Sequence, residues 1–233
     1  MRAMAAGSRT AAEPPACAPK HAGAAVRRGA WSYTIAHLSP PTFLSATCLF
    51  LFLAVFADHA RAQTGASSST EDAFANGRWR AEFLATAALE AWNYNPSHEE
   101  LYGLTQGVSY GLRDGLVLIA RQRLFYISQR RNDSRLLAIT SGLRARVYRR
   151  GRASGFLQFD LGVSDAAVAL PPGGTRFNYL AIGSGGMMMR INQRVQAIAV
   201  VEVLHISNAG IAGHDRNPDI EAIGPSVGIT IGF

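Results

Sequence analysis

Two segments near the C-terminus, residues 195–208 (VQAIAVVEVLHISN) and 220–233 (IEAIGPSVGITIGF), indicate the fold class. In the second segment the odd positions from Ile223 to Phe233 are apolar, whereas most even positions carry Gly, Ser, Thr or Ala. Because strand side chains alternate between two faces, such a strand has one apolar face and one small or polar face. This is the lipid-out, lumen-in pattern of a transmembrane β-barrel, and glycine on the inner face suits a narrow barrel of eight strands.

The same period-two alternation continues upstream. No stretch after residue 77 shows a 3.6-residue amphipathic period, and each alternating segment is long enough for a tilted transmembrane strand of about 9–11 residues. Including the two above, the predicted strands are residues 78–92, 101–113, 116–128, 136–149, 155–164, 177–191, 195–208 and 220–233.

The connections between these segments alternate in length. Short turns are expected at residues 113–115, 150–154 and 192–194, and longer loops at 93–100, 129–135, 165–176 and 209–219. Outer-membrane barrels place short turns on the periplasmic side and long loops outside. We therefore expect residues 78–233 to form an all-β domain, an eight-stranded antiparallel transmembrane β-barrel of the outer membrane. A soluble antiparallel sandwich is the alternative, and strands of this length in a cysteine-free domain argue against it.

The N-terminal quarter of the chain has the marks of an export signal. Residues 43–56 (FLSATCLFLFLAVF) are apolar but fall short of the roughly 20 residues of a membrane-spanning helix, and an A-x-A sequence ends at Ala62. Residues 1–62 are therefore predicted to be a signal peptide with a long N-terminal extension, cleaved near Ala62. A membrane anchor is the rival interpretation, and the long extension leaves open a start further downstream, for example near Val26. Residues 63–77 are expected to be a flexible lead-in.

Cleavage at that position would remove Cys17, Cys48 and the only lysine, Lys20. The mature chain could then hold neither a disulfide nor a cysteine-ligated metal. From residue 63 onward, 17 Arg against 14 Asp and Glu leave a net charge of about +3, compared with +7 for the whole chain. This charge is too small to indicate a nucleic-acid partner.

Three polar residues interrupt the apolar face of the last two strands. His205 and Ser207 share the odd, lipid-facing parity of their segment, and Glu221 has the same parity at the start of the next. A hydroxyl, an imidazole and a carboxylate within reach of one another form the arrangement of a serine hydrolase triad. The bland explanation is that both strands end in the polar headgroup layer, where such residues cost little. The parity of these residues alone does not decide between a catalytic triad and polar residues at the level of the headgroups.

The residues around this group resemble a known family. The stretch His205-Ile206-Ser207-Asn208-Ala209-Gly210, with Asn217-Pro218 and Glu221 after it, is similar to the C-terminal signature of the PagL-type lipid A 3-O-deacylases, the acyloxyacyl hydrolase family. The resemblance covers residues 78–233, although the last thirty carry its sharp motifs. It implies a small outer-membrane barrel with its active site on the outer wall, where Ser207 is the nucleophile, His205 the general base and Glu221 the orienting acid.

One position departs from the family pattern. The family often has Gly after Asn-Pro, but this chain has Asp219, which shares the parity of Glu221 and is a competing acid. Asn208 points inward by parity, so it either braces the strand end or supplies a backbone N–H to an oxyanion. His98 and His214 fall in predicted outer loops and are expected to be solvated. We expect no cofactor, and no His, Cys or Asp cluster has metal-ligand spacing.

The predicted function is that of an outer-membrane serine esterase that hydrolyses the 3-O-linked acyl chain of lipid A. Its partner would be lipid A or lipopolysaccharide in the outer leaflet, and the oligomeric state, a homodimer included, is left open. Two other functions remain open, a non-enzymatic structural or adhesive barrel and an outer-membrane phospholipase. Arginines of the outer loops could contact lipid A phosphates or could simply be solvated charges: Arg130, Arg131, Arg135 and Arg176.

Overall fold

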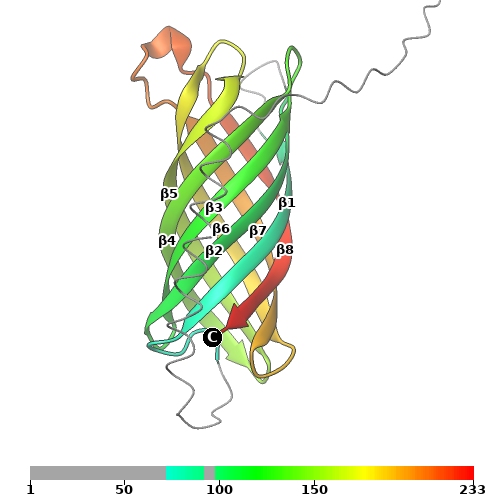
Figure 1. Cartoon of the computed structure of the whole chain (residues 1–233), viewed down its shortest axis with the longest axis vertical. Helices are drawn as coiled ribbons and strands as arrows, with labels where there is room; N and C mark the ends of the chain where they lie inside the picture. The colour runs from blue at the N-terminus through cyan, green and yellow to red at the C-terminus, as the bar shows by residue number, and fades with distance from the viewer. Residues whose placement is uncertain (1–71, 92–97) are drawn as a thin grey trace, which may run out of the picture. The chain divides into compact units, whose positions relative to one another are not determined.

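The computed structural model describes residues 72–91 and 98–233, which form a closed barrel of eight antiparallel strands (Figure 1). Each strand pairs with its neighbours in the chain, and β8 pairs with β1 to close the wall. Among the described residues, no helix is long and apolar enough to cross a membrane. The strands are β1 (Trp79–Glu90), β2 (Glu100–Arg113), β3 (Leu116–Ser128), β4 (Ser134–Arg150), β5 (Ala153–Leu170), β6 (Thr175–Arg190), β7 (Val195–Ser207) and β8 (Ile220–Gly232).

The period-two prediction holds along the wall. In β7, Val201 and Val203 face outward and are 53% and 41% exposed, whereas Glu202 between them points into the lumen and is 1% exposed. The outward face of every strand carries large apolar side chains, and such a face is stable against hydrocarbon. We call the end of the short turns after β2, β4 and β6 the periplasmic end, and the opposite end the outer end.

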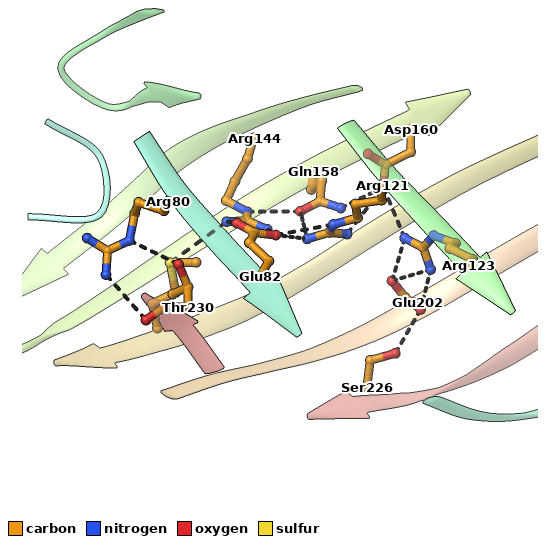
Figure 2. Close-up of polar contacts among 11 residues, drawn as sticks. Arg80, Glu82, Arg121, Arg123, Arg144, Gln158, Asp160, Glu202, Ser226 and Thr230 are labelled. Atoms are coloured by element: carbon orange, nitrogen blue, oxygen red, sulfur yellow. Dashed lines mark hydrogen bonds and ion pairs between the residues drawn. The ribbon is translucent and has the colours of Figure 1, made fainter. Parts of the chain in front are cut away.

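Ionic side chains fill the middle of the lumen (Figure 2). Glu82 of β1 accepts hydrogen bonds from Arg121 (2.6 Å) and Arg144 (2.7 Å). Glu202 of β7 accepts bonds from Arg123 (3.1 Å) and from the hydroxyl of Ser226 (2.7 Å). All six side chains are buried, so each charge has opposite charges or hydrogen-bond donors close by in place of water.

Apolar side chains lie above and below this ionic layer. The lumen near the outer end is packed by residues such as Leu101, Ile127 and Ile206, and the lumen near the periplasmic end by residues such as Phe156 and Ile198. Inward glycines leave room for the longer side chains. At Gly142, for example, an added Cβ would clash with the backbone carbonyl of Phe159.

The periplasmic end is closed by residues 72–77, the described part of the predicted lead-in. Phe74 is fully buried near Phe156, with 6.2 Å between ring centroids, and its carbonyl accepts a hydrogen bond from the N–H of Gly115. Asp72 forms ion pairs with Arg146 and, at 3.2 Å, with Arg149. The predicted signal peptide, residues 1–62, lies outside the described residues.

One predicted loop is mostly strand. Residues 165–176 were expected to form a long outer loop, but β5 continues to Leu170 and β6 begins at Thr175, so only residues 171–174 turn. The hairpin rises beyond the other strands in Figure 1, and the β5–β6 register shifts between Asp165 and Leu170. The polar Asp165 breaks the apolar alternation, and for this reason the sequence predicts that the loop starts there. The physical turn signal is instead Pro171-Pro172-Gly173-Gly174, where a positive φ at Gly173 reverses the chain.

Candidate functional site

The predicted triad lies at the outer end of β7 and β8. His205 and Glu221 are direct cross-strand partners, so strand pairing alone places their side chains on the same face. Ser207, two residues after His205, has the same parity and lies opposite Tyr179 of β6. The odd parity of all three residues therefore brings them together on the outer wall, as the sequence predicts.

The imidazole of His205 lies between the hydroxyl and the carboxylates. Its Nε2 is 3.1 Å from Ser207 Oγ, within hydrogen-bonding distance. Its Nδ1 is 3.5 Å from Glu221 Oε1. With the proton on Nδ1, facing the carboxylate, Nε2 is left with a lone pair that can accept the serine proton. The order hydroxyl, imidazole, carboxylate is that of a general-base-activated nucleophile.

A second carboxylate lies beside the first. Asp219 Oδ2 is 3.9 Å from Nδ1 of His205, compared with 3.5 Å for Glu221, so Glu221 is the nearer acid. The side chains of His205, Asp219 and Glu221 are 42%, 35% and 31% exposed, whereas the whole residue Ser207 is 8% exposed. The ring and the acids are thus open to the exterior, and the hydroxyl is tucked against the wall.

The same acids and the imidazole could also hold a cation. One ligand atom from each of His205, Asp219 and Glu221 lies within 4.8 Å of the other two. The sequence predicts no metal site, because these residues do not have the spacing of a metal-ligand motif. The feature of the sequence that groups these three residues is the odd parity that they share. A cation here would compete with the hydrogen-bonding role of Nδ1, so the two uses of the site can be separated by a chelator.

Asn208 holds the loop between β7 and β8. Its backbone N–H donates to Asn217 Oδ1 (3.0 Å), and its side chain bonds the Arg216 carbonyl and the N–H of Gly210 (2.9 Å). The N–H of Asn208 is therefore already engaged, and the geometry favours the bracing role over the oxyanion role. In the sequence, Asn217-Pro218 is typical of a turn, and no pattern there indicates the contact of Asn217 with the strand end.

The remaining predicted residues lie away from this group or are otherwise engaged. His98 and His214 are exposed in the outer loops, as expected. Arg176 pairs with Asp165 at 3.0 Å and donates to the carbonyl of Ala166. Arg135 is the second residue of β4, which lies across the barrel from β8 in the closed strand order.

Comparison with known proteins identifies the fold. No protein-family model matches the chain, and no curated protein matches it. Among solved structures, the crystal structure of Neisserial surface protein A is similar over 66% of this chain and 97% of that chain, with 14% identity and a TM-score of 0.51. This likeness shows the fold, a small outer-membrane β-barrel.

Two further structures overlay less closely and add nothing to that conclusion. One is the outer membrane protein OprG from Pseudomonas aeruginosa, with 12% identity over 69% of this chain and 97% of that chain. The other is the outer membrane enzyme PagL, with 15% identity over 64% of this chain and 98% of that chain. Each has a TM-score of 0.44.

Proposed function

We propose that this protein is an outer-membrane serine esterase that hydrolyses the 3-O-linked acyl chain of lipid A. The observation that supports this most directly is the contact of Ser207 Oγ with His205 Nε2, while Glu221 approaches Nδ1 from the other side of the ring. The motif resemblance at residues 205–210 adds the substrate class. An outer-leaflet lipid is also the substrate that an outward-facing site at this height would meet.

The reaction would proceed through an acyl-enzyme. His205 Nε2 takes the proton of Ser207 Oγ, and the oxygen attacks the acyl carbonyl carbon. The ester C–O bond then breaks, and the imidazolium returns its proton to the departing sugar oxygen. Water, activated by the same imidazole, hydrolyses the acyl-enzyme and releases the fatty acid. Glu221 would orient the ring and stabilise its positive charge.

The position of the site on the wall suits a substrate that never leaves the bilayer. An Arg or Lys on the lipid face costs about 2–4 kcal/mol at the midplane and about 0–1 kcal/mol near the interface, and an Asp or Glu costs less. Glu221 lies at the outer end of β8 and Asp219 in the loop just before that strand, so their charges cost little there. An acyl chain lying along the barrel can reach Ser207 sideways and needs no passage through the lumen.

The test is to express Ser207→Ala and His205→Ala and to measure release of the 3-hydroxy fatty acid from lipid A by mass spectrometry. Each variant should lose more than about 100-fold of the activity. Ser141→Ala, on the outward face of β4, and His214→Ala, in the outer loop, are matched controls that should remain active. Full activity in either triad variant would refute the assignment.

The same experiment separates the other functions. A structural or adhesive barrel predicts no change in any lipid, and a phospholipase predicts fatty acids released from phospholipids with lipid A left intact. Adding a chelator tests the cation use of His205, Asp219 and Glu221, since a triad needs no metal. Activity abolished by the chelator and restored by a divalent cation would replace the triad with a metal mechanism.

A further inference from the structure

A second feature of the outer wall lies on β2, β3 and β4, across the barrel from the triad. Tyr102, Tyr126 and Arg135 are successive cross-strand partners and form one outward-facing row at the outer end of these strands. The next outward row towards the membrane centre is Leu104, Leu124 and Leu137. A polar, cation-bearing row above an apolar row has the polarity of a lipid, with the head above and the chain below.

The wall is hollowed at this place. A depression of about 370 Å³ is lined by both tyrosines, by Leu104 and Leu124, and by Arg135. Gly103, which has no side chain, also contributes to the lining. Leu104 is 67% exposed and Leu124 is 51% exposed, so the apolar part of the depression opens sideways into the bilayer. An acyl chain can therefore lie in it without entering the barrel.

The exposed charges at the upper edge are positive in sum. Two exposed carboxylates lie there, Glu100 and Asp133, which accept hydrogen bonds from Tyr102 Oη (3.0 Å) and Tyr126 Oη and keep their negative charge, and three exposed arginines outnumber them. Arg135 is exposed, and no carboxylate of the described chain forms an ion pair with it. Arg130 and Arg131 add two exposed positive charges in the adjoining loop. A guanidinium in this position is suited to a phosphate group, which it can bind through paired N–H donors.

From this row, depression and charge we propose a lipid-binding site on β2–β4 that is separate from the triad. Its ligand is a phosphate-bearing lipid of the outer leaflet, with the phosphate on Arg135 and one acyl chain between Leu104 and Leu124. A free phosphate ion would use only the arginine and leave the apolar depression empty. The proposal does not depend on the esterase function, because β4 and β8 lie on opposite sides of the closed wall.

The experiment measures lipid retained on the delipidated full-length protein by native mass spectrometry. The probes are bis-phosphorylated lipid A, the same lipid with both phosphates removed, and inorganic phosphate as a competitor. All variants are made in a Ser207→Ala background, which prevents turnover if the triad is active. Arg135→Gln removes the phosphate contact, and Leu104→Trp fills the depression without a change of charge. Arg152→Gln, at an exposed arginine in the periplasmic turn, is the matched control.

We expect Arg135→Gln to weaken retention of phosphorylated lipid A by about tenfold, the loss of one charge-assisted contact, and to leave the dephosphorylated lipid unaffected. Leu104→Trp should weaken both lipids, and millimolar inorganic phosphate should displace neither. Equal retention by Arg135→Gln and its parent would overturn the proposal. So would an equal loss with Arg152→Gln, which would indicate non-specific attraction to positive charge, or displacement by inorganic phosphate, which would indicate a site for the free ion.

Discussion

Removing the carboxylate of Glu82 should destabilise the barrel more than any single surface change. Glu82 is fully buried and accepts four hydrogen bonds, two each from Arg121 and Arg144, at 2.6–3.2 Å. Breaking a buried ion pair by deleting one partner costs about 3–5 kcal/mol, because the remaining charge stays out of water. In Glu82→Ala two guanidinium groups lose their shared partner, and the remaining acid nearby, Asp160, is shared between Arg121 (3.7 Å) and Arg123 (3.4 Å). We therefore expect a loss near the upper end of that range.

The measurement is a urea titration of the protein folded into lipid vesicles, followed by tryptophan fluorescence and by the gel shift of folded barrels. Glu100→Ala is the control, since this exposed acid bonds only Tyr102 in the described chain and should cost less than about 1 kcal/mol. Adding Arg144→Met to Glu82→Ala should recover part of the loss, because one of the stranded charges is then gone. A Glu82→Ala variant within about 1 kcal/mol of the parent would show that the lumen charges are not mutually dependent.

Three further predictions concern the site, the wall and the periplasmic end. Glu221→Ala should lower the fatty-acid release assayed above more than Asp219→Ala does, because Glu221 is nearer to Nδ1 (3.5 Å against 3.9 Å); the reverse order would make Asp219 the triad acid. Gly142→Ala should impair folding into vesicles through its backbone clash, whereas Gly183→Ala, whose Cβ would meet nothing within 4 Å, should fold like the parent; equal yields would contradict this contrast. Phe74→Ala should cost about 3–5 kcal/mol in the urea titration, as for other buried aromatic side chains, and an unchanged midpoint would mean that residues 72–77 do not support the barrel.

One physical rule predicts from the sequence both the barrel and the grouping of the three polar residues. Period-two alternation assigns each residue to a face without knowledge of its partners, and hairpin connection then places β7 beside β8. Those two facts place His205, Ser207 and Glu221 on the same face of neighbouring strands. The register, with His205 opposite Glu221, brings them into contact, and the length of the connecting loop does not fix that register.

Three other features of the structure leave no signal in the period-two alternation. The pairing of Glu82 with Arg121 and Arg144 crosses the lumen, and alternation shows only that all three point inward. The burial of Phe74 was missed because a short Ala- and Ser-rich segment carries no periodic signal. The extension of β5 to Leu170 was missed because Asp165 breaks the apolar pattern before the Pro-Pro-Gly-Gly turn is reached.

The packed lumen also bears on the permeability of the membrane. In the described part of the chain, a layer of paired charges lies between two clusters of apolar side chains. A solute crossing the lumen would have to displace both apolar clusters and separate the paired charges. Many copies of such a cylinder could therefore crowd a membrane without compromising its role as a barrier to antibiotics and detergents. In planar bilayers, insertion should leave the electrical resistance unchanged.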